Sequence, residues 1–272
     1  MKLKPHAQNT NFQWRDRKGP FRLISTDQAR AWNEEGFFLL RNVIPAKQIS
    51  ALIDAIDPFE QKTEQFLESR GGKMGISRSN ELTFTIHLVA RSKIARDFTR
   101  SALFSNLCLD LLGPDVRLYW DQAVYKKPGN PRDFPWHQDN GYNFVEPQDY
   151  LTCWIPLTDA SVGNGCPWVI PGIHQQGTLN HWKTELGFEC LDNPVGAVPV
   201  EVKAGDIVVF SSLTPHRTGP NSTTDIRKAY ICQYAQDSAA MVAVDGTRTA
   251  QHDPTRQYLI CRNGVAVDYE ND

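Results

Sequence analysis

The sequence predicts a mainly β fold with an α-helical N-terminal layer. Helical periodicity is confined to residues 25–112, whereas short segments rich in β-branched and aromatic residues alternate with Gly, Pro and Asn turns over residues 113–235. Many short strands separated by turns are typical of a sandwich or barrel. The chain of 272 residues shows no internal repeat and no low-complexity linker, so we expect a single domain over residues 1–272.

The first expected helix follows a polar arm formed by residues 1–24. Ser25 and Gln28 match a capping box, in which a hydroxyl and an amide three residues apart satisfy backbone N–H groups at the start of a helix. This helix is expected to run to Glu35. Gly36 is expected to end it, because glycine adopts the left-handed conformation without steric cost.

The rest of the N-terminal layer contains one strand and two helices. A buried strand is expected over residues 37–40. A second helix then begins, and its apolar residues share one face at i, i+3, i+4 and i+7: Ile49, Leu52, Ile53 and Ile56. Residues 59–81 are polar and are expected to form a mobile excursion that could lie over a site. Residues 92–112 carry a third helical pattern.

The expected β core covers residues 113–235 and is followed by a C-terminal extension over residues 236–272. Its strands are short, apolar and bounded by turn residues. They are expected at residues 116–125, 150–157, 166–170, 198–202, 207–210 and 229–234.

The composition excludes several classes of protein. Lys and Arg number 29 against 31 Asp and Glu, so there is no basic excess of the kind that binds nucleic acid. No apolar run is long enough to span a membrane, and the first residues do not resemble a secretory signal. The six cysteines form no CxxC pair, which favours reduced thiols in a cytoplasmic protein. The oligomeric state is not indicated.

A candidate metal site is formed by His137, Asp139 and His216. His137 and Asp139 are two residues apart, so on a strand both side chains would lie on one face. That pair alone is a weak signal, because an Asp that accepts a bond from a surface His looks the same in sequence. His216 follows an apolar strand. Two imidazoles and one carboxylate leave coordination positions open, as an iron(II) oxygenase requires, and no fourth ligand suggests structural zinc.

Arg227 is a candidate anion-binding residue. It lies eleven residues after His216 and is followed by an expected strand. A guanidinium in that place could hold a dicarboxylate through paired hydrogen bonds. The alternative is a surface arginine on an edge strand.

The order of these motifs resembles the phytanoyl-CoA dioxygenase family of iron(II)- and 2-oxoglutarate-dependent oxygenases. The resemblance spans residues 26–235 and includes His137-x-Asp139, Asn164-Gly165-Cys166, Gly205-Asp206, His216 and Arg227. It implies a double-stranded β-helix, which is a cupin-like jelly-roll barrel with the metal at its mouth. It also implies that His137, Asp139 and His216 bind Fe(II), that Arg227 holds the distal carboxylate of the cosubstrate 2-oxoglutarate, and that O₂ is consumed.

The resemblance further assigns Thr218, Trp154 and Gln122 to the 2-oxoglutarate pocket, although each could equally be a packing residue. An aromatic pocket with a few polar groups suits a small organic substrate. We expect the following residues to line it: Asn140, Tyr142 and Trp168. No catalytic residue is expected beyond the metal ligands.

The resemblance implies hydroxylation, or another oxidation, of an unactivated carbon in a small metabolite or natural product, with release of succinate and CO₂. Asp139 favours hydroxylation over halogenation, because halogenating relatives carry a small residue in its place. Two alternatives stay open: a metal-dependent non-oxygenase of isomerase or hydrolase type, and a binding protein on the same barrel.

Overall fold

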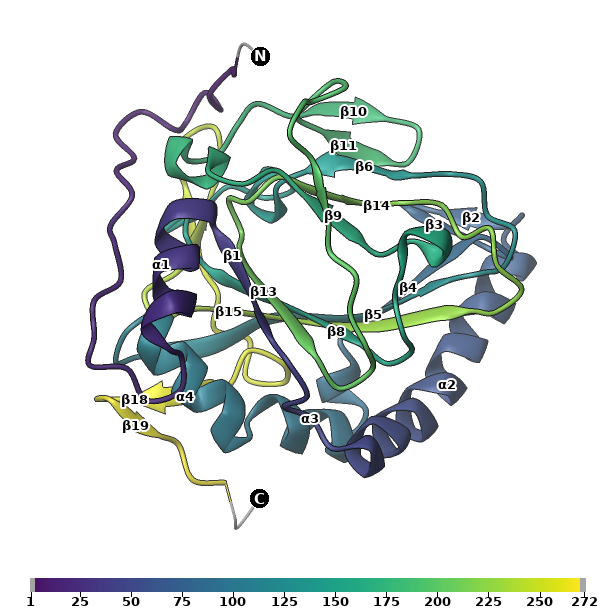
Figure 1. The fold of residues 1–272 in the computed structure, drawn as a ribbon, viewed down its shortest axis with the longest axis horizontal. Coiled ribbons are helices and arrows are strands. Elements are labelled where there is room, and N and C mark those ends of the chain that lie inside the picture. Colours follow the sequence, from purple (N-terminus) through teal and green to yellow (C-terminus); the bar gives the residue numbers. More distant parts are fainter. Residues whose placement is uncertain (1–2, 270–272) are drawn as a thin grey trace.

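The computed structural model describes residues 3–269 and is mainly β, with its helices in the N-terminal part (Figure 1). The α-helices of this range are α1 (Thr26–Glu35), α2 (Ala46–Ser69), α3 (Lys93–Thr99) and α4 (Ala102–Leu111). Short 3-10 turns are η1 (Leu88–Ala90), η2 (Asp139–Gly141), η3 (Val162–Asn164) and η4 (Ile173–Gln176).

A large antiparallel sheet forms the base of the molecule. Its order is β1-β13-β8-β15-β5-β4-β3-β2, and β18 also pairs with β5. The bounds are β1 (Phe37–Leu40), β13 (Ile207–Ser211), β8 (Leu151–Pro156), β15 (Arg227–Gln236), β5 (Val116–Lys126), β4 (Leu82–Ile86), β3 (Ser77–Arg78), β2 (Lys73–Met74), β18 (Leu259–Arg262) and β19 (Val265–Ala266).

A smaller sheet of order β12-β9-β14-β6 lies opposite the large one (Figure 1). Its strands are β12 (Val198–Pro199), β9 (Pro167–Val169), β14 (His216–Thr218) and β6 (Phe134–His137). The remaining strands are β10 (Trp182–Thr184) with β11 (Gly187–Glu189), and β7 (Val145–Glu146) with β16 (Ala240–Val242) and β17 (Arg248–Ala250).

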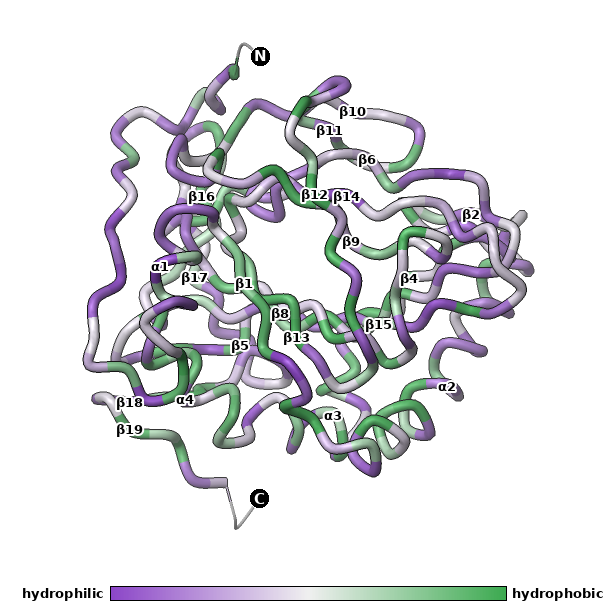
Figure 2. Tube along the Cα trace, viewed as in Figure 1, coloured by the Kyte–Doolittle hydropathy of each residue, from purple (hydrophilic) through white to green (hydrophobic). Residues whose placement is uncertain are grey.

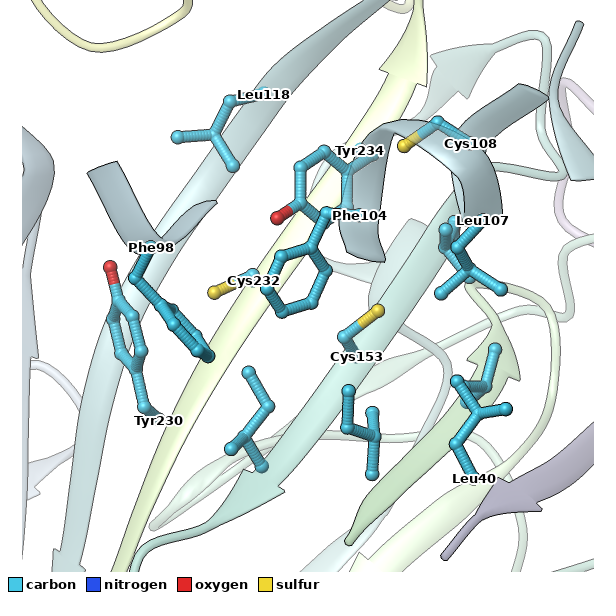
Figure 3. Packing of buried hydrophobic residues seen from close by; sticks show 14 of the residues in the cluster. Leu40, Phe98, Phe104, Leu107, Cys108, Leu118, Cys153, Tyr230, Cys232 and Tyr234 are labelled. Carbon is cyan, nitrogen blue, oxygen red and sulfur yellow. The ribbon is translucent and has the colours of Figure 1, made fainter. Parts of the chain in front are cut away.

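Two apolar cores hold these layers together. Outward residues of the large sheet pack against the helices, as Figure 3 shows for Phe104 of α4 beside Tyr234 of β15, whose ring centroids are 5.6 Å apart. A second core fills the space between the two sheets and includes Trp154, Phe210 and Ile231. Strand alternation therefore sends every second residue of β8, β13 and β15 into the space between the sheets, where the candidate site lies.

The N-terminal elements match some sequence expectations and correct others. The Ser25 capping box and left-handed Gly36, with φ of 82°, are confirmed. The single helix expected over residues 92–112 is wrong, because the chain breaks after Thr99 and Ser101 begins a new helix. The mobile excursion expected over residues 59–81 is also wrong in large part. Helix α2 continues through this segment to residue 69, since Glu60 and Leu67 extend its buried face.

The polar arm lies along the body of the protein. Figure 2 shows it mostly in the purple of hydrophilic residues. The amide of Asn9 donates to the carbonyls of Gln176 and Thr178, and Arg17 pairs with Asp149 at 2.5 Å. Among the described helices, none combines the length and apolar character that a membrane span requires.

Candidate metal and cosubstrate site

The candidate metal ligands converge at the end of the small sheet. His137 is the last residue of β6, Asp139 begins η2, and His216 begins β14 directly opposite His137. One ligand atom from each residue lies within 4.8 Å of the others. Two neighbouring strands and one turn therefore bring together residues that are 79 positions apart in the sequence.

Backbone contacts fix the tautomer of both histidines. The Nδ1 atom of His137 lies 2.8 Å from the carbonyl oxygen of Pro135, and that of His216 lies 3.0 Å from the carbonyl of Thr214. A carbonyl can only accept a hydrogen bond, so each Nδ1 carries the proton and each Nε2 keeps a free lone pair. Both Nε2 atoms face Oδ1 of Asp139, at 3.9 and 3.7 Å.

The carboxylate of Asp139 is oriented from the large sheet. Thr152 of β8 donates to Oδ2 of Asp139 at 2.6 Å, and Gln233 of β15 donates to the Thr152 hydroxyl at 3.4 Å. Because Oδ2 is held in this way, Oδ1 is the atom that points between the two imidazoles. Such oriented ligands favour metal binding, since little side-chain freedom is lost when the ion binds.

Burial favours the uncharged forms of the three candidate ligands. Burial lowers the pKa of His137 to about 3 and that of His216 to about 4, and it raises the pKa of Asp139. Two neutral imidazoles and a buried carboxylate together carry at most one negative charge. A divalent cation would offset the desolvation that these groups suffer, and the N₂O donor set fits a first-row metal such as iron.

Asp139 does not lie on a strand, which corrects the expectation for the His137-x-Asp139 pair. The strand β6 ends at His137, and the backbone N–H of Gln138 donates to Nε2 of His181 at 3.0 Å. Asp139 then enters a 3-10 turn. The two side chains still face one point, because the turn replaces the strand geometry that would have aligned them.

Arg227 lies deep between the sheets at the start of β15. Its side chain is fully buried, Nη1 donates to the carbonyl of Val124 at 3.3 Å, and its Cζ lies 5.3 Å from the ring centre of Trp154. Within residues 3–269, Nε and Nη2 have no hydrogen-bond partner. Burial lowers the pKa of this guanidinium to about 10, so it stays charged at neutral pH. A buried cation with two idle donors is suited to an anionic ligand.

Two adjoining pockets lie beside the metal ligands, and we name them the inner and the outer lobe of the site. The inner lobe contains three of the residues assigned to the cosubstrate: Gln122, Trp154 and Thr218. Its walls come from both sheets. The outer lobe shares His137, Asp139 and Gln122 with the inner lobe and has a volume of about 240 Å³.

Tyr142 lines the outer lobe, whereas Asn140 and Trp168 line neither lobe. The amide of Asn140 is buried and donates to Oγ1 of Thr178 at 2.7 Å, so its hydrogen bonds hold a turn. The ring of Trp168 packs on Arg217 at 5.2 Å. The structure therefore brings only one of the three predicted substrate-lining residues to either lobe.

Sequence reasoning missed the polar residues that support the site. They are Thr152, Gln233, His181 and Lys126. Strand alternation could have found two of them: Thr152 lies on the same face as Trp154, and Lys126 lies on the same face as Gln122. His181 gives no such signal, because its loop has no regular period.

Known proteins share this fold and sequence pattern. The sequence profile of the phytanoyl-CoA dioxygenase (PhyH) family matches residues 32–229. A probable phytanoyl-CoA dioxygenase from Caenorhabditis elegans is 26% identical over 249 residues, which cover 83% of this chain and 80% of that protein.

Two solved structures show the same fold at lower identity. EctD from S. alaskensis with 2-oxoglutarate and 5-hydroxyectoine is 19% identical with a TM-score of 0.70, covering 98% of this chain and 92% of that one. The epimerase SnoN in complex with Fe³⁺, α-ketoglutarate and nogalamycin RO is 17% identical with a TM-score of 0.64, covering 90% and 95%.

Proposed function

The chain belongs to the phytanoyl-CoA dioxygenase family of iron(II)- and 2-oxoglutarate-dependent oxygenases, and from that membership we propose that it oxidises an unactivated carbon of a small organic molecule by hydroxylation. It is a non-haem iron dioxygenase, with Fe(II), 2-oxoglutarate and O₂ as its cofactor and cosubstrates. Succinate and CO₂ are the products formed from 2-oxoglutarate.

The observation that carries the proposal is the convergence of two free Nε2 atoms and one carboxylate oxygen within 4.8 Å. We assign His137, Asp139 and His216 as the iron ligands. Iron bound there would supply the activation of O₂ that couples decarboxylation of 2-oxoglutarate to oxidation of the substrate. With three protein ligands, the ion would keep coordination positions for reactants, and His137, Asp139 and His216 all line the inner lobe from which reactants would come.

The inner lobe is the proposed 2-oxoglutarate site. Arg227, which packs behind the lining residue Trp154, holds the distal carboxylate through its unpartnered Nε and Nη2, and Thr218 lines the lobe itself. Trp154 packs against the guanidinium and excludes water from it. Gln122 lines both lobes and so separates cosubstrate from substrate. A protein that does not bind 2-oxoglutarate would have no use for this buried cation, which disfavours a hydrolase, a 2-oxoglutarate-independent isomerase and a binding protein.

The outer lobe is the proposed substrate site. It is lined by aromatic residues, among them Tyr119, Tyr142 and Tyr150, and by the amides Gln122, Asn143 and Gln233. Among its described lining residues, the proposed metal ligand Asp139 is the one carboxylate, and there is no Lys or Arg. Burial raises the pKa of all three phenols, so they remain neutral hydrogen-bond donors. The reacting part of the substrate is therefore small and uncharged. Such a site fits a metabolite or natural product that carries hydroxyl or carbonyl groups.

The proposal extends to the finer fold and to the setting of the protein. We propose that the two facing sheets are a double-stranded β-helix, that residues 1–272 act as one domain, and that the protein works without nucleic acid. All six cysteines are buried and free, which supports a reducing compartment such as the cytoplasm.

The test is succinate formation by protein supplied with Fe(II), ascorbate and 2-oxoglutarate. Wild-type protein should form succinate slowly alone and faster when a panel of small neutral molecules includes the substrate. His137→Ala and Asp139→Ala should form almost none. The surface variant His252→Ala is the matched control and should behave as wild type, because His252 is half exposed and contacts Asp237 outside the site. Equal succinate formation in all four proteins would contradict the proposal.

A further inference from the structure

We propose that Lys126 is a second cation of the cosubstrate pocket, which positions Thr218 and adds charge beside Arg227 so that the pocket favours a dicarboxylate over a 2-oxo acid with one carboxylate. The inference rests on the proposed use of 2-oxoglutarate. Lys126 acts through Thr218 and through its charge, so it is a positioning residue.

The first observation is where the ammonium of Lys126 lies. Lys126 ends β5 directly opposite Arg227 of β15, and its side chain is fully buried. Its Nζ donates to the carbonyls of Gly219 at 2.5 Å and Arg132 at 3.2 Å and to Oγ1 of Thr218 at 3.3 Å. One ammonium thus joins the large sheet, the segment before β6 and the end of β14, and it fixes the hydroxyl that lines the inner lobe.

The second observation is the room that the chain makes for this side chain. Gly165 has a φ of +89°, and a Cβ atom there would lie 2.6 Å from the carbonyl oxygen of Gly219 and 3.0 Å from Cδ of Lys126. Only glycine fits both the backbone angle and the close approach. The Asn164-Gly165-Cys166 motif therefore packs the Lys126 side chain against the end of β14.

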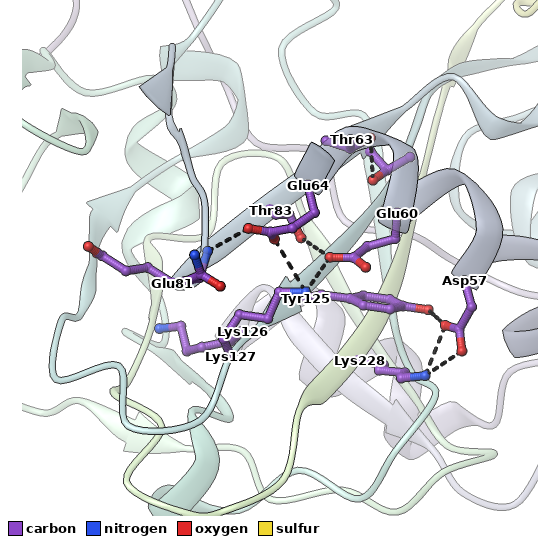
Figure 4. Close-up of polar contacts among 12 residues, drawn as sticks. Asp57, Glu60, Thr63, Glu64, Glu81, Thr83, Tyr125, Lys126, Lys127 and Lys228 are labelled. Carbon is purple, nitrogen blue, oxygen red and sulfur yellow. Dashed lines mark hydrogen bonds and ion pairs between the residues drawn. The ribbon is translucent and has the colours of Figure 1, made fainter. Parts of the chain in front are cut away.

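The third observation is that this lysine lacks a counter-ion. The neighbouring Lys127 reaches Glu60 at 2.6 Å and Glu64 at 3.4 Å, whereas Lys126 extends away from that cluster (Figure 4). Over the described part of the chain, Lys126 forms no ion pair with a carboxylate. Arg227 opposes the charge of Lys126 more strongly than the nearby Asp133 supports it, and a dianionic ligand would relieve the repulsion between the two cations.

Without a bound anion, Lys126 is only partly protonated near neutral pH. Burial and the nearby Arg227 lower the pKa of Lys126 to about 7. A carboxylate bound beside Arg227 favours the ammonium form, so binding of the dicarboxylate should charge Lys126 fully.

The variant experiment compares Lys126→Met, Lys126→Arg and the matched control Lys127→Met in anaerobic Fe(II) protein. The dissociation constants of 2-oxoglutarate and of 2-oxobutyrate, which lacks the distal carboxylate, are measured for each protein. Lys126→Met should weaken 2-oxoglutarate about 10- to 100-fold while leaving 2-oxobutyrate within about twofold, since its charge acts on the distal carboxylate alone. Lys126→Arg should restore part of the loss, and Lys127→Met should leave both constants unchanged.

Equal weakening of both acids by Lys126→Met, or no weakening, overturns the inference while leaving the proposed function intact. Wild-type protein that binds no 2-oxoglutarate overturns both.

Wild-type protein gives a second measurement that needs no variant. Binding of 2-oxoglutarate at pH 8 should take up as much as about one proton, measured from the binding enthalpy in buffers of different ionisation enthalpy. The other charged groups around Lys126 are Arg227 on β15, Arg217 on β14, and Arg132 and Asp133 before β6. Absence of proton uptake overturns the inference.

Discussion

Strands β5 and β15, with Lys127 directly after β5, carry similar charged residues with opposite surroundings on their two faces. On the outer face, Lys228 pairs with Asp57 of α2 at 2.7 Å and Lys127 pairs with Glu60 of α2 at 2.6 Å (Figure 4). On the inner face, Arg227 and Lys126 have no carboxylate partner within the described residues. The outer charges attach a helix to the sheet, and the inner charges are left for a ligand.

The comparison is well controlled because each pair consists of adjacent residues. Arg227 precedes Lys228, and Lys126 precedes Lys127, so strand alternation alone sends them to opposite faces. Substitutions on the inner face should therefore lose function and spare stability. Substitutions on the outer face should do the reverse.

The largest effect is expected at the metal ligands. Asp139→Ala should lower succinate formation on the order of 10³-fold or more, because the ion that activates O₂ is lost. The metal-free variant should be at least as stable as wild type, since an unpaired buried carboxylate costs free energy. Enzyme assays and thermal unfolding of metal-free protein measure the two effects. A variant that is strongly destabilised yet still binds iron would break the comparison.

A smaller effect is expected at Arg227. Arg227→Met should raise the KM for 2-oxoglutarate about 30- to 100-fold, corresponding to about 2–3 kcal/mol of lost binding, while the affinity for iron stays within a few fold. Without ligand, this variant should unfold at a temperature equal to or above that of wild type, because a buried unpaired cation has been removed. A lower unfolding temperature with an unchanged KM would make Arg227 a structural residue.

Lowering the pH should destabilise the metal-free protein through the two buried histidines of the site. In the folded protein the pKa values of His137 and His216 are about 3 and about 4, below the ordinary 6.5. Between pH 6.5 and about 4, the unfolded chain therefore protonates these two histidines while the folded chain keeps them neutral. The free energy of unfolding of metal-free protein should fall as pH drops from 6.5 toward about 4, by about 1.4 kcal/mol per pH unit for each histidine. Urea unfolding of wild type and His216→Leu measures it, and identical slopes would contradict the assignment.

The smallest functional effect is expected on the outer face. Glu60→Ala removes the acceptor of Lys127 and of the Thr83 hydroxyl, at 2.6 and 2.8 Å, and should lower the free energy of unfolding by about 1–3 kcal/mol. The KM for 2-oxoglutarate should stay within about twofold. A large change in KM would show that the two faces are coupled through the strand.

The sequence predicted the parts of this comparison that depend on local pattern. Apolar periodicity located β5, β8, β13 and β15, and capping chemistry located α1. The order of the motifs identified the candidate metal ligands and Arg227, because functional residue types at a fixed spacing can be recognised in the sequence.

Long-range pairing could not be predicted from local pattern. Beyond Pro58, α2 buries Glu60 and Leu67, and Glu60 contacts Lys127, which lies 67 residues away. The burial of Lys126 depends on the clearance at Gly165 and on the register between β5 and β15. Such contacts are set by tertiary packing, so a lysine that ends a strand gives no sign of its counter-ion or of the lack of one.

Anaerobic titration of Fe(II) and 2-oxoglutarate tests the central claim most directly. Wild-type protein and the outer-face control Lys228→Met should bind one Fe(II) per chain and develop the visible charge-transfer band of a chelated 2-oxo acid at the same 2-oxoglutarate concentration. Arg227→Met should bind iron equally well and need about 30- to 100-fold more 2-oxoglutarate, and His216→Ala should develop no band. Equal titration curves for all four proteins would contradict the assignment of both the iron and the 2-oxoglutarate sites.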